Sequence, residues 1–242
     1  MEELERVPMQ KEFVVNGEKV TKTVALFNFT AFNRNGKPTI EKDYSANCVT
    51  MFDYDEFGNC IHTNNSRGID VWSEFDASGN EIHTKTSYNE EMWYEYDNND
   101  NCIYTKDSRG FEAVYRYNEK NQKYYEYGSR FGRVILHQYD KNGKLIRDME
   151  SSGSVTKYEY DQNGNLAAKV TSYGFLYYFE YDSKGNMTYM AQGHIDGDID
   201  VENPEVNFDE IEMDEFFFEY EFYPNGKVQK KFVYENYRKK ES

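Results

Sequence analysis

The chain has 242 residues, of which 38% are hydrophobic and 17% aromatic, and its formal net charge is −16. This charge argues against a nucleic-acid partner, because phosphate binding requires clustered Lys and Arg, and it suits either simple solubility or a basic protein partner. The abundance of Tyr and Phe favours β-sheet, since these side chains fit half-buried pleated surfaces. No stretch approaches about 18 consecutive apolar residues, so we expect no membrane span.

The N-terminal residues lack a cationic start followed by an apolar run, so we expect no secretory signal. Next in the chain, the sequence FVVNGEKV around Phe13 predicts a short hairpin, and we assign residues 1–27 to an N-terminal cap.

The chain has three cysteines, a small and odd number: Cys48, Cys60 and Cys102. Such a set favours a reducing compartment, and we expect a cytoplasmic protein.

An aromatic anchor then recurs at intervals of 21 or 22 residues. The anchors are Phe32, Tyr54, Phe75, Tyr96, Tyr117, Tyr139, Tyr160, Tyr181 and Phe222. Fixed spacing of this kind indicates a repeated structural unit, which we assign to residues 28–190. The last interval spans two periods, so we predict an acidic insertion at residues 191–217 in place of one repeat. A last hairpin and a basic C-terminal cap then occupy residues 218–242.

Turn residues divide each repeat into two strands. An Asp follows most anchors and a Gly comes three residues later, as in DEFG and DQNG. This pattern predicts a type I turn with a bulge, in which Asp accepts backbone hydrogen bonds and Gly supplies a positive φ. A second turn, such as SRG at residues 66–68, lies half a period away. Each repeat is therefore a hairpin, and the chain predicts roughly 18 to 20 antiparallel strands.

We accordingly predict an all-β, single-domain array of nine or ten β-hairpin repeats. Alternation along a strand places Met92, Tyr94 and Tyr96 on one face and Glu95 on the other, so one face is aromatic and the other charged. A flat sheet of this width would leave its aromatic face in water. We therefore expect a long sheet that coils around itself or folds over into a sandwich.

The phrase Y-x-Y-D-x-x-G-N, followed by a β-rich strand and a Ser or Thr with Gly, resembles the YD repeat of the RHS family. The resemblance covers roughly residues 28–190, and EFYPNGK at residues 221–227 also resembles the YxNGK turn of antitoxin-type hairpin repeats. It implies a sheet of the kind that spirals into a shell around a toxic cargo, and a link to bacterial polymorphic toxin systems. The chain is far shorter than such a shell and shows neither the self-cleaving RHS core nor a toxin domain, so no catalytic residue carries over.

The residue three positions before each anchor lies on the charged face. These residues are Met51, Trp72, Trp93, Val114, Leu136, Lys157 and Tyr178, and they predict an apolar stripe across the strands. Exposed Trp often anchors protein partners, so Trp72, Trp93, Leu136 and Tyr178 are candidate partner-binding residues. The alternative is a second small core, covered by a fold-over of the sheet or by the insertion.

The insertion is the second candidate site. Residues 196–221 contain twelve acidic side chains and no Lys or Arg. The candidate binding residues in it are Asp196, Asp198, Asp200, Asp209, Glu210, Glu212, Asp214 and Glu215. They either mimic a nucleic acid and block a basic enzyme, or form a solvated excursion. DGDIDVE lacks the Gly and the final Glu of a calcium-binding loop, so we expect no calcium there.

No catalytic or metal-binding set emerges from the sequence. The recurrent Asp residues are explained by their turns. Cys60 and His62 lie two apart on one predicted strand and so share a face, but His83 lies about 10 Å away, too far to share a zinc ion. We expect no cofactor and a non-catalytic protein-binding role, such as an immunity or antitoxin factor against a basic toxin. A self-associating segment of an RHS-like shell is the alternative, and an enzyme ranks last.

Overall fold

The computed structural model describes residues 4–197, 199–201 and 211–236. Within these residues the chain forms nineteen antiparallel β-strands and no helix, and hence no helix that would cross a membrane. The strands are β1 (Met9–Val15), β2 (Glu18–Phe32), β3 (Pro38–Asp43), β4 (Cys48–Tyr54), β5 (Cys60–Asn65), β6 (Asp70–Phe75), β7 (Glu81–Thr86), β8 (Glu91–Tyr96), β9 (Cys102–Asp107), β10 (Glu112–Tyr117), β11 (Lys123–Gly128), β12 (Arg133–Tyr139), β13 (Leu145–Glu150), β14 (Val155–Tyr160), β15 (Leu166–Thr171), β16 (Phe175–Tyr181), β17 (Met187–His194), β18 (Met213–Phe222) and β19 (Val228–Asn236).

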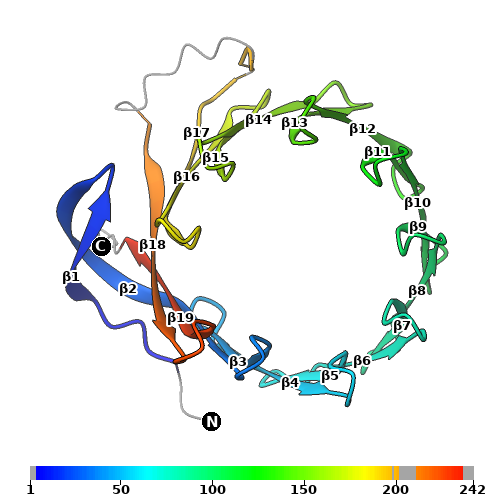
Figure 1. Cartoon of the computed structure of the whole chain (residues 1–242), viewed down its shortest axis with the longest axis horizontal. Coiled ribbons are helices and arrows are strands. Elements are labelled where there is room, and N and C mark those ends of the chain that lie inside the picture. The colour runs from blue at the N-terminus through cyan, green and yellow to red at the C-terminus, as the bar shows by residue number, and fades with distance from the viewer. Residues whose placement is uncertain (1–3, 198, 202–210, 237–242) are drawn as a thin grey trace.

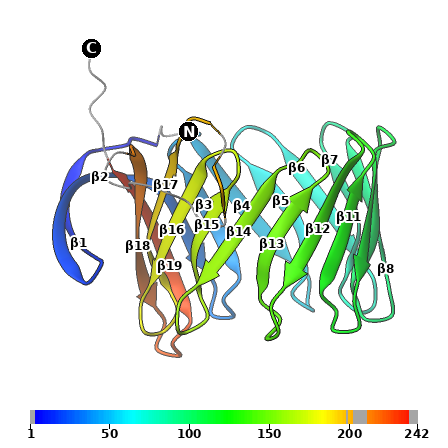
Figure 2. The ribbon, with the colours of Figure 1, turned by 90° about the horizontal axis from the view of Figure 1, so that it is seen from above.

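The sheet closes on itself. Strands β2 to β19 pair in chain order, and β19 then pairs with β2, for example at Phe232↔Phe29, which makes an 18-strand barrel (Figure 1). Figure 2 shows the same strands from the side, tilted within a belt. The all-β hairpin array is confirmed, but the expected open sheet that coils or folds over is wrong. Closure pairs the backbone groups that two open edges would leave unpaired.

The N-terminal hairpin lies outside this ring (Figure 1). β1 pairs with the first half of β2, whereas the second half of β2 belongs to the ring and pairs with β3 and β19. The hairpin packs on the outer face of β17 to β19, where the rings of Phe13 and Phe217 stack with centroids 4.2 Å apart. The main core forms here from Phe13, Val24, Tyr189, Ala191, Phe217 and Tyr234.

Strand register defines an outer and an inner face. The outer face carries Phe217 under the hairpin, and cross-strand pairs continue this face around the ring to Trp93 and Trp72. The anchor residues, such as Tyr96, alternate with them and therefore face inward. From β3 to β15, Ile135 is the only buried strand residue. Neither face of this part is packed against another layer, as expected for a ring of this width, which is too wide for side chains to fill.

The turns follow the predicted chemistry. Gly58 has φ of 87°, and Asp100, which stands where other repeats have Gly, has φ of 60°. Asp76 Oδ1 accepts a hydrogen bond from the Asn80 backbone N–H at 2.8 Å, while Asn80 Nδ2 donates to Asp76 Oδ2 at 3.1 Å. These bonds from Asn80 hold the pKa of the Asp76 carboxyl below its usual value. The Asn that ends the repeated phrase is thus the partner of the turn Asp.

Two recurrent contacts hold neighbouring strands together at the ends where no turn joins them. The hydroxyl of Tyr96 donates to the carbonyl oxygen of Glu81 at 2.7 Å. At the opposite rim, Ser108 N–H donates to the Glu91 carbonyl at 2.9 Å, and Ser108 Oγ accepts from the Glu91 N–H at 3.1 Å. Equivalent Tyr bonds occur at Tyr54, Tyr117, Tyr139 and Tyr160, and equivalent Ser bonds at Ser66, Ser151 and Ser172. The repeated Tyr and Ser therefore act as clasps between neighbouring strands, the Tyr between successive hairpins and the Ser within one hairpin.

Candidate protein-binding surface

Trp72 projects from the outer face of β6 and is 45% exposed. Its indole stacks on the imidazole of His62 in β5, with centroids 5.4 Å apart and an interplanar angle of 18°. His62 is held on both sides, because Nδ1 lies 3.0 Å from Asp53 Oδ2 and Nε2 lies 2.9 Å from Asp70 Oδ1. The hydrogen bonds to Asp53 and Asp70 raise the pKa of His62. The tryptophan is thus exposed and also held in place.

One repeat further along, the same arrangement returns. Trp93 is 41% exposed and stacks on His83 with the same centroid distance of 5.4 Å and the same angle of 18°. His83 Nε2 lies 3.1 Å from Glu91 Oε2, and Nδ1 lies 3.6 Å from Glu74 Oε1. We call these two Trp–His pairs the tryptophan ladder. Cross-strand pairing places them two strands and two residues apart, or about 12 Å.

The structure brings together some of the predicted stripe residues and separates others. Trp72, Trp93 and Leu136, which is 43% exposed, lie uncovered on the outer face, so a second core at these positions is ruled out. Tyr178, at the other end, is half-buried beside the main core, and its hydroxyl donates to Asn16 Oδ1 of the N-terminal hairpin at 3.2 Å. The stripe is also not continuously apolar, since Lys85 pairs across from Trp72.

Carboxylates outnumber cations around the ladder. The acidic residues are Asp53, Asp70, Glu74, Glu91, Glu95 and Glu112, and the basic ones are Lys85 and Lys106. Lys85 Nζ lies 3.2 Å from Glu91 Oε1, and Lys106 Nζ lies 3.6 Å from Glu112 Oε1, so both ammonium groups are compensated. The side chains of Asp53 and Glu74 are each 71% exposed. The tryptophan ladder is therefore an aromatic surface surrounded by an excess of negative charge.

The expectation that Cys60 and His62 share a face is wrong. Cys60 pairs with Tyr54 and His62 pairs with Asp53, and these neighbours on β4 point to opposite faces. A bulge at Ile61 shifts the register by one residue, which turns His62 outward toward Trp72. Sequence spacing alone therefore missed the Trp–His pairs, although His62 and His83 occupy equivalent repeat positions.

The acidic candidates that the structure describes do not all lie on one surface. Asp198, Asp209 and Glu210 lie outside the described residues. Asp196 is fully exposed, whereas Glu215 lies below the N-terminal hairpin, where Lys22 Nζ is 2.7 Å away. Tyr189 and Asn236 also donate to Glu215, so this carboxylate supports the core.

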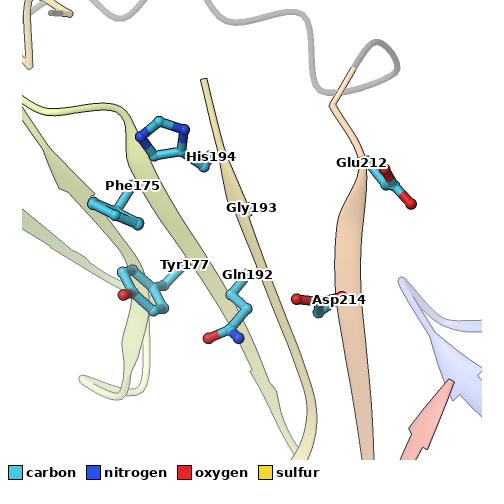
Figure 3. Close-up of a pocket in the computed structure, with 7 residues that line it drawn as sticks. All are labelled: Phe175, Tyr177, Gln192, Gly193, His194, Glu212 and Asp214. Carbon is cyan, nitrogen blue, oxygen red and sulfur yellow. The ribbon is translucent and has the colours of Figure 1, made fainter. Parts of the chain in front are cut away.

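Along β16 to β18, the inner face has a hollow of about 410 Å³ (Figure 3). It is lined by Phe175, Tyr177, Gln192, Gly193, His194, Glu212 and Asp214. The rings of Phe175 and His194 are 4.5 Å apart between centroids. Aromatic and carboxylate groups together suit a cationic side chain. No sequence pattern indicated this hollow, because it depends on the way β16, β17 and β18 meet.

The protein is thus a closed ring of β-hairpin repeats. The RHS repeat family model matches residues 139–175, which lie inside the span of the resemblance noted in the sequence. No curated protein matches it.

Among solved structures, the TcdB2-TccC3-Cdc42 complex matches at 15% identity and a TM-score of 0.39, covering 90% of this chain and 13% of that chain. TcdB2-TccC3 without its hypervariable C-terminal region matches at 13% identity and a TM-score of 0.39, covering 91% and 13%. A porin-like protein from Bacteroides uniformis matches at 11% identity and a TM-score of 0.43, covering 88% and 97%. The chain thus spans about an eighth of the TcdB2-TccC3 chains.

Proposed function

We propose that this protein is a non-catalytic binding protein whose tryptophan ladder docks a basic partner protein. The observation that carries the proposal is that Trp72 and Trp93 are 45% and 41% exposed although each is stacked on a fixed His. Tryptophan is enriched among residues that dominate binding energy. Because stacking already restricts these two side chains, less rotamer entropy is lost when a partner covers them.

Charge supports a basic partner. The whole chain carries a net charge of −16, and the carboxylates around the ladder are only partly compensated. Complementary charge speeds encounter and rejects acidic competitors. In its more specific form, the proposal is an immunity or antitoxin role against a basic toxin, which the RHS repeats and the acidity favour.

Self-association through sheet edges is the less favoured alternative. In an open array both terminal strands would offer unpaired backbone groups to another copy. Here the ring strands are paired on both sides, and unpaired edge remains only in the N-terminal hairpin among the described strands.

A comparison of three protein forms tests the proposal. Wild type, the double variant Trp72→Ala/Trp93→Ala and the control Phe57→Ala/Phe131→Ala would be used to capture partners from the native cell extract. Phe57 and Phe131 are both 83% exposed, which makes them matched aromatic losses. We expect one basic protein to be retained by wild type and control and lost by the Trp variant, with all three equally folded by circular dichroism. Equal retention by the Trp variant contradicts the proposal.

A further inference from the structure

Resting on the proposed function, we infer that the ladder recognises an extended segment with two basic side chains four residues apart. The segment crosses β6 to β8 on the outer face, following the ring. In each of the two repeats, one basic side chain of the bound segment contacts the indole and the carboxylate two residues further along the same strand. These pairs are Trp72 with Glu74 on β6, and Trp93 with Glu95 on β8.

The chemistry of each pair suits a cation. Residues two apart on a strand share a face and lie about 7 Å from each other, so a guanidinium or ammonium group fits between them. The indole face that the stacked histidine leaves open, on the side of the next strand, attracts the cation, and the carboxylate accepts its hydrogen bonds. Glu74 is 71% exposed even though it approaches His83, and Glu95 is exposed as well. Each carboxylate is therefore within reach of a partner in solution.

The spacing of the two pairs selects the partner. Trp72 and Trp93 are about 12 Å apart by strand pairing, and on a convex outer face the side-chain tips diverge slightly further. In an extended chain, residues i and i+4 face the same side and lie about 13 Å apart. Residues i and i+2 lie at about 7 Å, and residues i and i+6 at about 20 Å, so neither engages both pairs.

The neighbouring charges are compatible with this partner. Lys85 and Lys106 are the cations on the strands between and beside the two tryptophans, and each is paired with a glutamate. His62 and His83 cover one face of each indole. Counted without the histidines, six carboxylates against two lysines give the surface a net charge of −4.

The protein contains only two tryptophans, so tryptophan fluorescence, excited beyond the absorption band of its tyrosines, reports on this surface alone. The probe is a nine-residue, Trp-free peptide of Ser and Thr with two Arg four residues apart. The matched peptide has the same composition with the two Arg adjacent. We expect the spaced peptide to change the fluorescence at about tenfold lower concentration than the adjacent one. Equal titration curves for the two peptides overturn the inference.

A charge variant provides the second arm. Glu74→Gln/Glu95→Gln is expected to weaken binding of the spaced peptide about tenfold, while Glu119→Gln, in the exposed turn after β10, leaves it unchanged. Unchanged binding by the double variant overturns the inference. These results can be told apart from a failure of the proposed function. If capture of a partner depends on Trp72 and Trp93 but the two peptides bind equally, the proposed function stands and the inference about spaced basic side chains is rejected.

Discussion

The outer face of the ring is buried in one region and exposed to solvent in another. Over β17 to β19 the N-terminal hairpin covers it, and Val24 and Phe217 have no exposed surface. Over β4 to β8 no segment that the structure describes covers it, and Trp72 remains 45% exposed. Both regions use the same face of the sheet. The strand register thus decides which side chains face outward, and a segment distant in sequence decides whether they are buried.

Phe217→Ala, in the covered region, should have the largest effect. Phe217 is fully buried and stacks on Phe13, so its loss removes buried apolar surface and leaves a cavity. We expect the free energy of unfolding to fall by about 3–5 kcal/mol, measured by urea denaturation. A loss below about 1 kcal/mol would mean that the hairpin is not firmly docked.

Lys22→Met tests the polar part of the same region. Lys22 pairs with Glu215, whose side chain is only 16% exposed, and the variant leaves this carboxylate without its cation. A loss of about 1–2 kcal/mol is expected at neutral pH. Lys19→Met on the exposed part of β2 is the control and should change little. Similar curves for the two variants would show that the ion pair is unimportant.

Tyr96→Phe weakens a clasp in the uncovered region and should cost about 1 kcal/mol. Burial raises the pKa of Tyr96 to about 12, above its ordinary value of 10.0. A pKa raised by folding means that the tyrosine stabilises the fold below about pH 10, and that this contribution is lost as the pH rises toward 12. Unfolding measured from pH 8 to 12 should show the difference between wild type and variant shrinking over that interval. A constant difference would contradict the assignment.

Trp72→Ala should change stability by less than about 1 kcal/mol, because the side chain is already half in water. Thermal melts of this variant beside Phe217→Ala sharpen the contrast between the two regions. A loss as large as that of Phe217→Ala would show that the ladder is a structural element, whatever it binds.

His62→Gln should have the smallest effect, and one that depends on pH. The hydrogen bonds to Asp53 and Asp70 raise the pKa of His62, so the imidazolium stabilises the fold fully below the unfolded pKa, near 6.5. This contribution disappears as the pH rises through the folded pKa. Melting temperatures of wild type and variant should therefore differ most near pH 5.5 and least at pH 9. His194→Gln, on an exposed residue, is the control.

Local residue patterns predicted the parts of this fold that depend on local chemistry. The Asp and Gly positions predicted the turns, and alternation predicted which face carries Trp72. Closure was missed because β19 meets β2 through residues such as Lys230 and Ala31, which are far apart in sequence and carry no mutual signal. The His62 contact was missed because one bulge residue, Ile61, reverses the face to which the later residues of β5 point.

Closure also limits how such a ring changes size. β2 and β19 meet antiparallel, as do all other neighbours. A duplication or deletion of one 21-residue unit adds or removes two strands, so the last strand still runs opposite to the first. The gain or loss of a single strand would bring those two strands together in parallel and would replace this hydrogen-bond pattern with a different one. Keeping the antiparallel pattern around the whole ring therefore requires its diameter to change by whole hairpins, with an even number of strands.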